Sequence, residues 1–297
     1  MNILLLGKGG QVGWELQRSL AVLGQVTALD FDSPEHCGDF SQPEGVRDTV
    51  RQLRPDVIVN AAAHTAVDKA ESEPEFARLL NATTPGVLAE EAGRLGAWLV
   101  HYSTDYVFDG SGSRPWVEAD APAPLSCYGR TKLEGEQHIQ QSGCKHLILR
   151  TSWVYAARGG NFAKTMLRLA QERDRLTVID DQWGAPTGAD LLADVTAHAV
   201  RHLQQHPEDG GLFHCVASGE TNWHLYAKEV LALAAKSQPA IKIKATDVAP
   251  VPTSAFPTPA TRPHNSRLNT AKLQSTFGLT LPHWQAGVAR MLQEVLA

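Results

Sequence analysis

Short apolar runs alternate with longer segments of helical spacing through the first half of the chain, and this order restricts the fold more than any other feature. A strand followed by a helix, repeated several times, predicts a parallel sheet with helices on both faces. We therefore expect an α/β fold with a doubly wound parallel sheet. The predicted strands are residues 3–6, 26–29, 57–59, 98–102 and 147–149.

A glycine-rich loop, residues 7–13, separates the first predicted strand from the first helix, with glycines at Gly7, Gly10 and Gly13. Glycine permits a tight turn and a close approach of the backbone to a pyrophosphate, which the amides of a helix N-terminus also attract. Asp30 ends the second strand, where a carboxylate accepts hydrogen bonds from the adenosine ribose. The sequence therefore predicts a Rossmann-type dinucleotide site. Asp30 favours NADH, although Lys8 could accommodate the extra phosphate of NADPH.

The regular alternation fades after about residue 151, where Pro and Gly residues interrupt the pattern. This change indicates a second, smaller lobe of mixed structure. The C-terminal residues 284–295 keep helical spacing and predict an amphipathic helix, whereas residues 249–259 predict a loop or an extended edge. We expect residues 1–152, with a returning segment at about 189–216, to form the dinucleotide-binding domain, and residues from about 153–188 and 217–297 to form the substrate-binding lobe.

Charge and composition exclude several classes of partner. The net charge is -5 and the basic residues form no block, which argues against nucleic-acid and membrane-surface binding. Residues 1–6 lack a basic leader and predict no secretion signal, and no apolar stretch reaches the ~20 residues that cross a bilayer. We therefore expect a cytoplasmic protein. The 12 histidines and 4 cysteines show no metal-ligand spacing.

Tyr128 and Lys132 lie four positions apart, which places them on one face of a helix. A phenol with an ordinary pKa of about 10 needs a lower value to exchange a proton near neutrality, and a nearby ammonium group lowers it. The hydroxyl group of Thr104, or of Ser103 on the other side of the strand, follows the fourth predicted strand. We interpret Tyr128, Lys132 and Thr104 as the catalytic group of a carbonyl reductase.

Several longer motifs carry a resemblance to a known family: residues 7–13, 60–68, 103–110, 128–132, 150–155, 184–187 and 262–268. Together they resemble the dTDP-4-dehydrorhamnose reductase family of the extended short-chain dehydrogenases/reductases. The resemblance implies reduction of the C4 ketone of dTDP-4-dehydro-L-rhamnose to dTDP-L-rhamnose by NADPH or NADH. This would be the final step of dTDP-rhamnose biosynthesis for bacterial lipopolysaccharide or other surface polysaccharide.

The resemblance also implies roles for individual residues of the predicted site. In addition to the glycines and Asp30, the cofactor would contact Gln11, Val12, Asp39, Phe40, Ala63, His64, Thr65, Tyr102, Tyr128 and Lys132. The dTDP-sugar would contact Thr104, Asp105, Trp153, Arg262 and Asn265. A buried indole is commonly structural, so the alternative for Trp153 is a core residue. Asn265 and Ser266 could instead cap a helix that begins near residue 269.

The family resemblance further implies a homodimer with Mg²⁺ at its interface. Glu15, Asp190 and Glu294 lie at the corresponding positions, and carboxylates suit this ion. Three acidic residues on solvated helix surfaces need no metal, however.

Two other functions are compatible with the same scaffold. A nucleotide-sugar epimerase or dehydratase would keep the cofactor site, but a dehydratase is expected to carry an Asp-Glu pair after the active threonine, where this chain has Asp105 and Tyr106. A non-catalytic regulatory subunit, of the type that binds methionine adenosyltransferase, would tolerate loss of Tyr128 or Lys132. Both residues are present, so the sequence favours the reductase.

Overall fold

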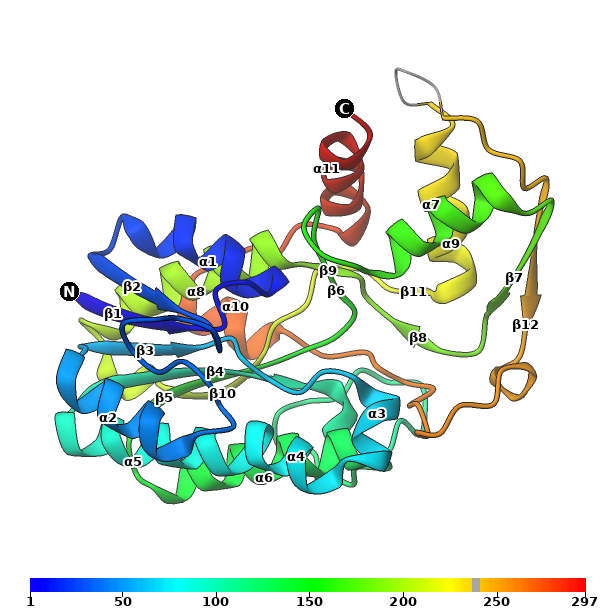
Figure 1. The fold of residues 1–297 in the computed structure, drawn as a ribbon. Helices are drawn as coiled ribbons and strands as arrows, with labels where there is room; N and C mark the ends of the chain where they lie inside the picture. The colour runs from blue at the N-terminus through cyan, green and yellow to red at the C-terminus, as the bar shows by residue number, and fades with distance from the viewer. Residues whose placement is uncertain (237–240) are drawn as a thin grey trace.

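A six-stranded parallel sheet forms the centre of the computed structural model, which describes residues 1–236 and 241–297 (Figure 1). The order of its strands, β10-β5-β4-β3-β1-β2, changes direction between β1 and β3, as in a doubly wound sheet. This arrangement confirms the predicted fold class and the five predicted strands. The strands are β1 (Asn2–Leu6), β2 (Gln25–Leu29), β3 (Val57–Asn60), β4 (Trp98–Thr104), β5 (Lys145–Thr151) and β10 (Gly211–His214).

Helices cover both faces of this sheet because its strands carry apolar side chains on both sides. Ile3 and Leu5 enter one core, whereas Leu4 and Leu6 enter another. The first face is covered by α1 (Gln11–Ala21), α8 (Ala189–Leu203) and α10 (Ala271–Phe277). The second is covered by α2 (Pro43–Leu53), α5 (Thr84–Leu95) and α6 (Cys127–Gln141), with α3 (Val67–Ser72), α4 (Pro74–Arg78) and the π-helical turn η1 (Leu79–Thr83) beside α6.

A smaller lobe stands beside the carboxyl ends of the strands and has a core of its own (Figure 1). Its helices are α7 (Phe162–Glu172), α9 (Trp223–Ala234) and α11 (Trp284–Leu296), and its parallel strand pair is β7 (Arg175–Ile179) with β12 (Asp247–Val251). Short strands connect the two parts: β6 (Val154–Tyr155), β8 (Trp183–Gly184), β9 (Thr187–Gly188) and β11 (Thr221–Asn222). Short 3₁₀ turns lie at η2 (Asp105–Val107), η3 (Pro207–Asp209) and η4 (Thr253–Ala255).

The chain leaves the sheet after β5, returns to it for α8 and β10, and returns once more for α10. Leu273 and Phe277 of α10 pack in the first core, although residues 217–297 were assigned as a whole to the small lobe. The predicted C-terminal helix is α11. The segment 249–259 begins as part of β12 and continues into η4. In the part of the chain described here, no helix is both long and apolar enough to span a bilayer.

Candidate active site

A cavity of about 850 Å³ opens at the carboxyl ends of β1, β3, β4 and β5, next to the small lobe. Its volume lies at the upper end of the range for small-molecule sites. The wall begins at the glycine-rich loop and continues to Tyr128, Lys132 and the aromatic residues of the small lobe. Most predicted site residues line it: Gly7, Gly10, Gln11, Val12, Asp30, Asp39, Phe40, Ala63, Thr65, Tyr102, Thr104, Asp105, Tyr128, Lys132 and Trp153.

The glycine-rich loop leaves the backbone exposed to a ligand. Gly7 has a φ of 86°, and a Cβ atom there would lie 2.7 Å from the amide nitrogen of Ala62. Gly13 lies outside the cavity wall, and a side chain there would collide with the carbonyl oxygen of Gly7. Gly10 precedes α1 and provides no side-chain cap. The first amides of α1 are therefore available for an anionic group such as a pyrophosphate.

Asp30 lies in this wall together with Asp39 and Phe40, the residues that the sequence predicts for the adenosine end of a dinucleotide. Its Oδ2 atom accepts a hydrogen bond from the Gly9 amide at 2.9 Å, and its Oδ1 atom accepts one from the Phe31 amide at 3.1 Å. These two amides fix the carboxylate at the edge of the cavity. An ionised carboxylate held in this way can accept ribose hydroxyls and disfavours a phosphate group beside it.

His64 takes a different place from its sequence neighbours Ala63 and Thr65. Its side chain is buried and is not part of the cavity wall. The His64 amide donates to Oδ1 of Asn81 at 2.8 Å, and the Asn81 side chain donates to the His64 carbonyl at 3.1 Å. Asn81 lies in the π-helical turn η1, where the widened backbone brings it toward this loop. The Asn81 side chain therefore holds this loop through the backbone of His64.

Tyr128 stands in the first turn of α6, which begins where Ser126 accepts the Gly129 amide at 3.1 Å. Its ring packs edge to face against Tyr106 at a centroid distance of 5.5 Å. Burial raises the pKa of Tyr128 to about 12, although a hydrogen bond with Thr104 lowers it. Thr104 also accepts the Tyr106 amide and donates to Oδ1 of Asp105, both at 3.1 Å. The phenol is therefore protonated near neutral pH and ready to donate.

Lys132 is buried one turn further along α6. Its Nζ atom donates to the Tyr102 carbonyl at 2.6 Å and lies 3.2 Å from Nε2 of His101. Burial lowers the pKa of Lys132 to about 8, and the nearby Glu136 opposes this shift. The sequence predicts that Lys132 lowers the pKa of Tyr128. In the structure without a ligand, desolvation is the largest influence on the pKa of both groups.

Three further hydroxyl groups line the same cavity as Tyr128 and Lys132. Ser103, Thr151 and Ser152 have buried hydroxyl oxygens with no hydrogen-bond partner among the described residues. Buried polar atoms normally have partners, so these oxygens suit the hydroxyl groups of a bound sugar. Of the three, sequence reasoning singled out only Ser103. Thr151 ends β5 and Ser152 follows it, and their position at a strand end was the available signal.

Asp105 lies at the same end of the cavity and is buried. Burial raises the pKa of Asp105 to about 6, against hydrogen bonds from Ser266 and Thr104 that lower it. A carboxyl group with this pKa changes charge close to neutrality. When ionised, Asp105 can therefore accept hydrogen bonds from sugar hydroxyls. In the absence of a ligand, its buried charge destabilises the fold.

Trp153 reaches the cavity from the strand end with an unusual backbone, since its φ is 50°. Its ring stacks on Trp223 of α9 at a centroid distance of 3.7 Å. Trp223 donates from Nε1 to Gln182 at 3.0 Å and also lines the cavity. A bulky residue keeps a left-handed backbone only where its surroundings hold it. Trp223, which sequence reasoning missed, provides that support from a distant part of the chain.

Arg262 and Asn265 lie outside the cavity wall. Arg262 pairs with Asp68, with 2.8 Å between Nη2 and Oδ2. The buried Asn265 amide donates to the carbonyl oxygens of Ser111 at 3.2 Å and Arg114 at 2.8 Å, and so ties two loops together. Asn265 and Ser266 do not cap a helix, because α10 begins at Ala271, whose amide donates to Asn269 at 2.9 Å.

The three acidic residues considered for Mg²⁺ are paired with arginines. Glu15 lies 3.7 Å from Arg18, whereas Asp190 and Glu294 lie 3.2 and 3.6 Å from Arg290. The only potential metal cluster among the described residues is elsewhere, at His206, Glu208 and Asp209 on the surface. Within a single chain the three carboxylates therefore do not form a metal site.

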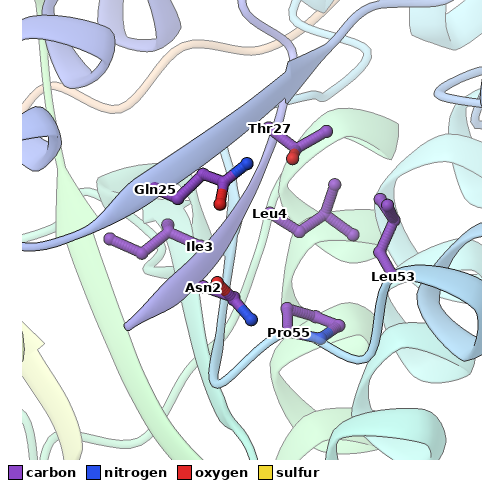
Figure 2. Close-up of a pocket in the computed structure, with 7 residues that line it drawn as sticks. All are labelled: Asn2, Ile3, Leu4, Gln25, Thr27, Leu53 and Pro55. Carbon is purple, nitrogen blue, oxygen red and sulfur yellow. The ribbon is translucent and has the colours of Figure 1, made fainter.

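A second depression, of about 150 Å³, lies at the opposite end of the sheet, beside the start of β1 (Figure 2). Its wall carries no titratable or nucleophilic side chain apart from the hydroxyl of Thr27. The residues that line it are Asn2, Ile3, Leu4, Gln25, Thr27, Leu53 and Pro55. This depression therefore offers no group for catalysis.

Comparisons with known proteins agree on one family. The profile described as the RmlD substrate binding domain matches residues 1–297. A protein from Salmonella typhimurium named dTDP-4-dehydrorhamnose reductase is 64% identical over 295 residues, and one of the same name from Shigella flexneri is 63% identical; each match covers 99% of this chain and 98% of the relative. The crystal structure of dTDP-4-dehydrorhamnose reductase from Bacillus anthracis in complex with NADP is 32% identical, covers 99% of both chains and superposes with a TM-score of 0.86.

Proposed function

The chain belongs to the RmlD substrate binding domain family, and on this premise we propose that it is an NAD(P)H-dependent dTDP-4-dehydrorhamnose reductase. It reduces the C4 ketone of dTDP-4-dehydro-L-rhamnose to give dTDP-L-rhamnose. The assignment agrees with the function that the sequence motifs predicted.

One observation carries the proposal within the structure itself. A single cavity joins the uncapped, glycine-lined start of α1 to a phenol, a buried lysine and a threonine hydroxyl. The first part suits a dinucleotide and the second suits a ketone. A reductase needs both in one cavity, because hydride transfer requires the two reactants in contact.

The residues of the chain bind the cofactor and the ketone and supply the proton that the reduction requires. When bound, the nicotinamide cofactor supplies the hydride for the carbonyl carbon. Tyr128 donates its phenolic proton to the carbonyl oxygen, and its raised pKa keeps that proton in place until charge develops there. Thr104 shares a hydrogen bond with Tyr128 and polarises the same oxygen. Lys132 lies in the adjoining wall, where it suits the hydroxyl groups of the cofactor ribose.

Substrate contacts are proposed for the groups beside this centre. Thr104, Asp105 and Trp153 line the sugar end of the cavity, and the unpaired hydroxyls of Thr151 and Ser152 add two partners for the sugar. Arg262 and Asn265 support this end indirectly, since both are engaged with other parts of the protein.

A spectrophotometric assay of cofactor oxidation tests the function directly. The purified protein is mixed with dTDP-4-dehydro-L-rhamnose and either NADPH or NADH, cofactor oxidation is followed by absorbance, and the product is identified by mass spectrometry. We expect stoichiometric cofactor oxidation and formation of dTDP-L-rhamnose. The ratio of kcat/KM for the two cofactors measures the preference that Asp30 imposes.

The alternative activities give different results in the same assay. An epimerase or dehydratase regenerates its cofactor, so the substrate would change without net cofactor oxidation. A regulatory subunit would bind cofactor without turnover. Either result, obtained with folded and cofactor-bound protein, contradicts the reductase.

The proposal includes a homodimer but gives Mg²⁺ no part in the reaction. A metal at Glu15, Asp190 and Glu294 would need carboxylates from two copies, because those of one chain are paired with Arg18 and Arg290. Light scattering of the protein with and without a chelator tests both points. A dimer that dissociates only when the chelator is present would assign the metal to the interface.

A further inference from the structure

Three buried side chains form a line beneath the catalytic wall. Asn60 ends β3, His101 lies next to it in β4, and Lys132 comes from α6. The Asn60 amide nitrogen lies 3.0 Å from Nδ1 of His101, and Nε2 of His101 lies 3.2 Å from Nζ of Lys132. All three side chains are at most 2% exposed. His101 therefore touches the catalytic lysine but lines no part of the cavity.

The orientation of Asn60 is fixed by the backbone. The Ala62 amide donates to Oδ1 of Asn60 at 3.0 Å, and a backbone amide can only donate. The atom that faces His101 must therefore be the Asn60 nitrogen, which is a donor. Its partner Nδ1 must accept, so a neutral His101 carries its hydrogen on Nε2.

This tautomer has a consequence for Lys132. The Nε2 hydrogen of His101 points at Nζ, so the contact is a hydrogen bond only if Nζ has a free lone pair, as in the neutral amine. When Lys132 is an ammonium group, either this bond or the bond to Asn60 is lost. Protonation of Lys132 therefore costs one buried hydrogen bond.

The groups around His101 and Lys132 do not remove the link between the His101 tautomer and the protonation of Lys132. Burial, followed by the proximity of Lys132, holds the pKa of His101 well below its ordinary value, so the ring is neutral. The charged group that acts on Lys132 is Glu136 on α6, which is itself paired with Arg150 of β5 at 2.6 Å. The phenol of Tyr128, one turn away on α6, is neutral near neutral pH. The β5 residue beside His101 in the sheet is the apolar Ile148.

We propose that His101, held by Asn60 as the tautomer with its hydrogen on Nε2, is a positioning residue that favours the neutral amine of Lys132. The inference rests on the reductase function proposed above. In that function, the contact with His101 allows Lys132 to lose and regain a proton at the pH at which Tyr128 donates its own. His101 acts through Lys132 and does not touch the substrate.

The tautomer can be measured without an activity assay. Two-dimensional ¹H–¹⁵N NMR of the histidine side chains distinguishes Nδ1–H from Nε2–H, and the signals of His101 are those missing from a His101→Gln sample. In the full-length protein at pH 9, with and without NADP⁺, we expect the Nε2–H tautomer. The Nδ1–H tautomer, or a doubly protonated ring, overturns the proposal.

Two variants test the effect on Lys132. His101→Gln keeps an N–H group near the position of Nε2, whereas His101→Asn keeps polar atoms only near the position of Nδ1. In the pH profile of kcat, we expect the limb due to Lys132 to stay in place in His101→Gln and to move up by about one pH unit in His101→Asn, the equivalent of one buried hydrogen bond. Equal shifts in both variants, or no shift in His101→Asn, contradict the proposal.

The two proposals fail in distinguishable ways. Absence of reductase turnover with the Nε2–H tautomer present would contradict the function alone. Normal turnover with the other tautomer would contradict the role of His101 alone. If a variant does not fold, the tautomer of the unmodified protein still decides the question.

Discussion

Replacing Tyr128 by Phe removes one hydroxyl group from the cavity wall and leaves the ring in place. The edge-to-face contact with Tyr106 is kept, and the hydrogen bond with Thr104 is lost. A single neutral hydrogen bond contributes about 1 kcal/mol to stability. For a chain of this length, that loss lowers the melting temperature by about 2–4 °C at most.

The expected effect on catalysis is much larger than the effect on stability. A pKa of about 12 means that Tyr128 holds its proton at pH 7, which is the form that a proton donor needs. Loss of a positioned general acid typically lowers the rate by about 10²–10⁴-fold, or roughly 3–5 kcal/mol of transition-state stabilisation. We therefore expect kcat of Tyr128→Phe to fall by ~10²-fold or more.

The assay combines three measurements on the same protein: NADPH oxidation, cofactor affinity by fluorescence titration and thermal unfolding. Tyr226→Phe is the matched control, because it removes a buried hydroxyl of the small lobe that has no hydrogen-bond partner in the described structure. We expect the control to keep its turnover. A Tyr128→Phe protein that binds NADPH normally and turns over near the wild-type rate would refute the role of the phenol.

Three further predictions follow from individual side chains. The pKa of Asp105 is raised to about 6 in the fold, so the folded state holds this proton more tightly than the unfolded state, and stability is lost as pH rises from about 4 to 6. Asp105→Asn should therefore raise the melting temperature at pH 7 but not at pH 3.5. Equal gains at both pH values would contradict this titration of Asp105. Glu136→Gln leaves the buried guanidinium of Arg150 unpaired and should cost about 3 to 5 kcal/mol of unfolding free energy in urea titrations, with recovery in a Glu136→Leu, Arg150→Met double variant. Asp30→Ala removes the carboxylate beside Gly9 and should raise the ratio of kcat/KM for NADPH over NADH; an unchanged ratio would exclude Asp30 as the discriminating residue.

The fold class could be read from the sequence because strand and helix periodicity are local properties. Each predicted strand of the sheet is a short, mostly apolar run, and all of these runs except the half-buried edge strand β2 are buried in the structure. The sixth strand, β10, was not predicted, because Gly211–His214 is short and lies apart from the regular alternation of strands and helices. It was placed only as part of a returning segment.

The motifs also predicted much of the cavity wall, since residues that follow parallel strands must meet at one edge of the sheet. Gly7, Asp30, Thr104 and the pair on α6 gather there. Trp223 could not be found in this way, because its contact with Trp153 joins segments 70 positions apart and belongs to the small lobe. Nothing local in either segment encodes that stacking.

The sequence by itself determined which chemical groups the site contains and the order in which strands deliver them. Only the tertiary structure decided their protonation, because desolvation depends on what packs around a group and not on its neighbours in the chain. Tyr128 and Lys132 suggested a phenol made acidic by an ammonium group. Burial instead leaves the phenol protonated, and His101 of β4, which is held by Asn60 of β3, contacts the lysine on α6.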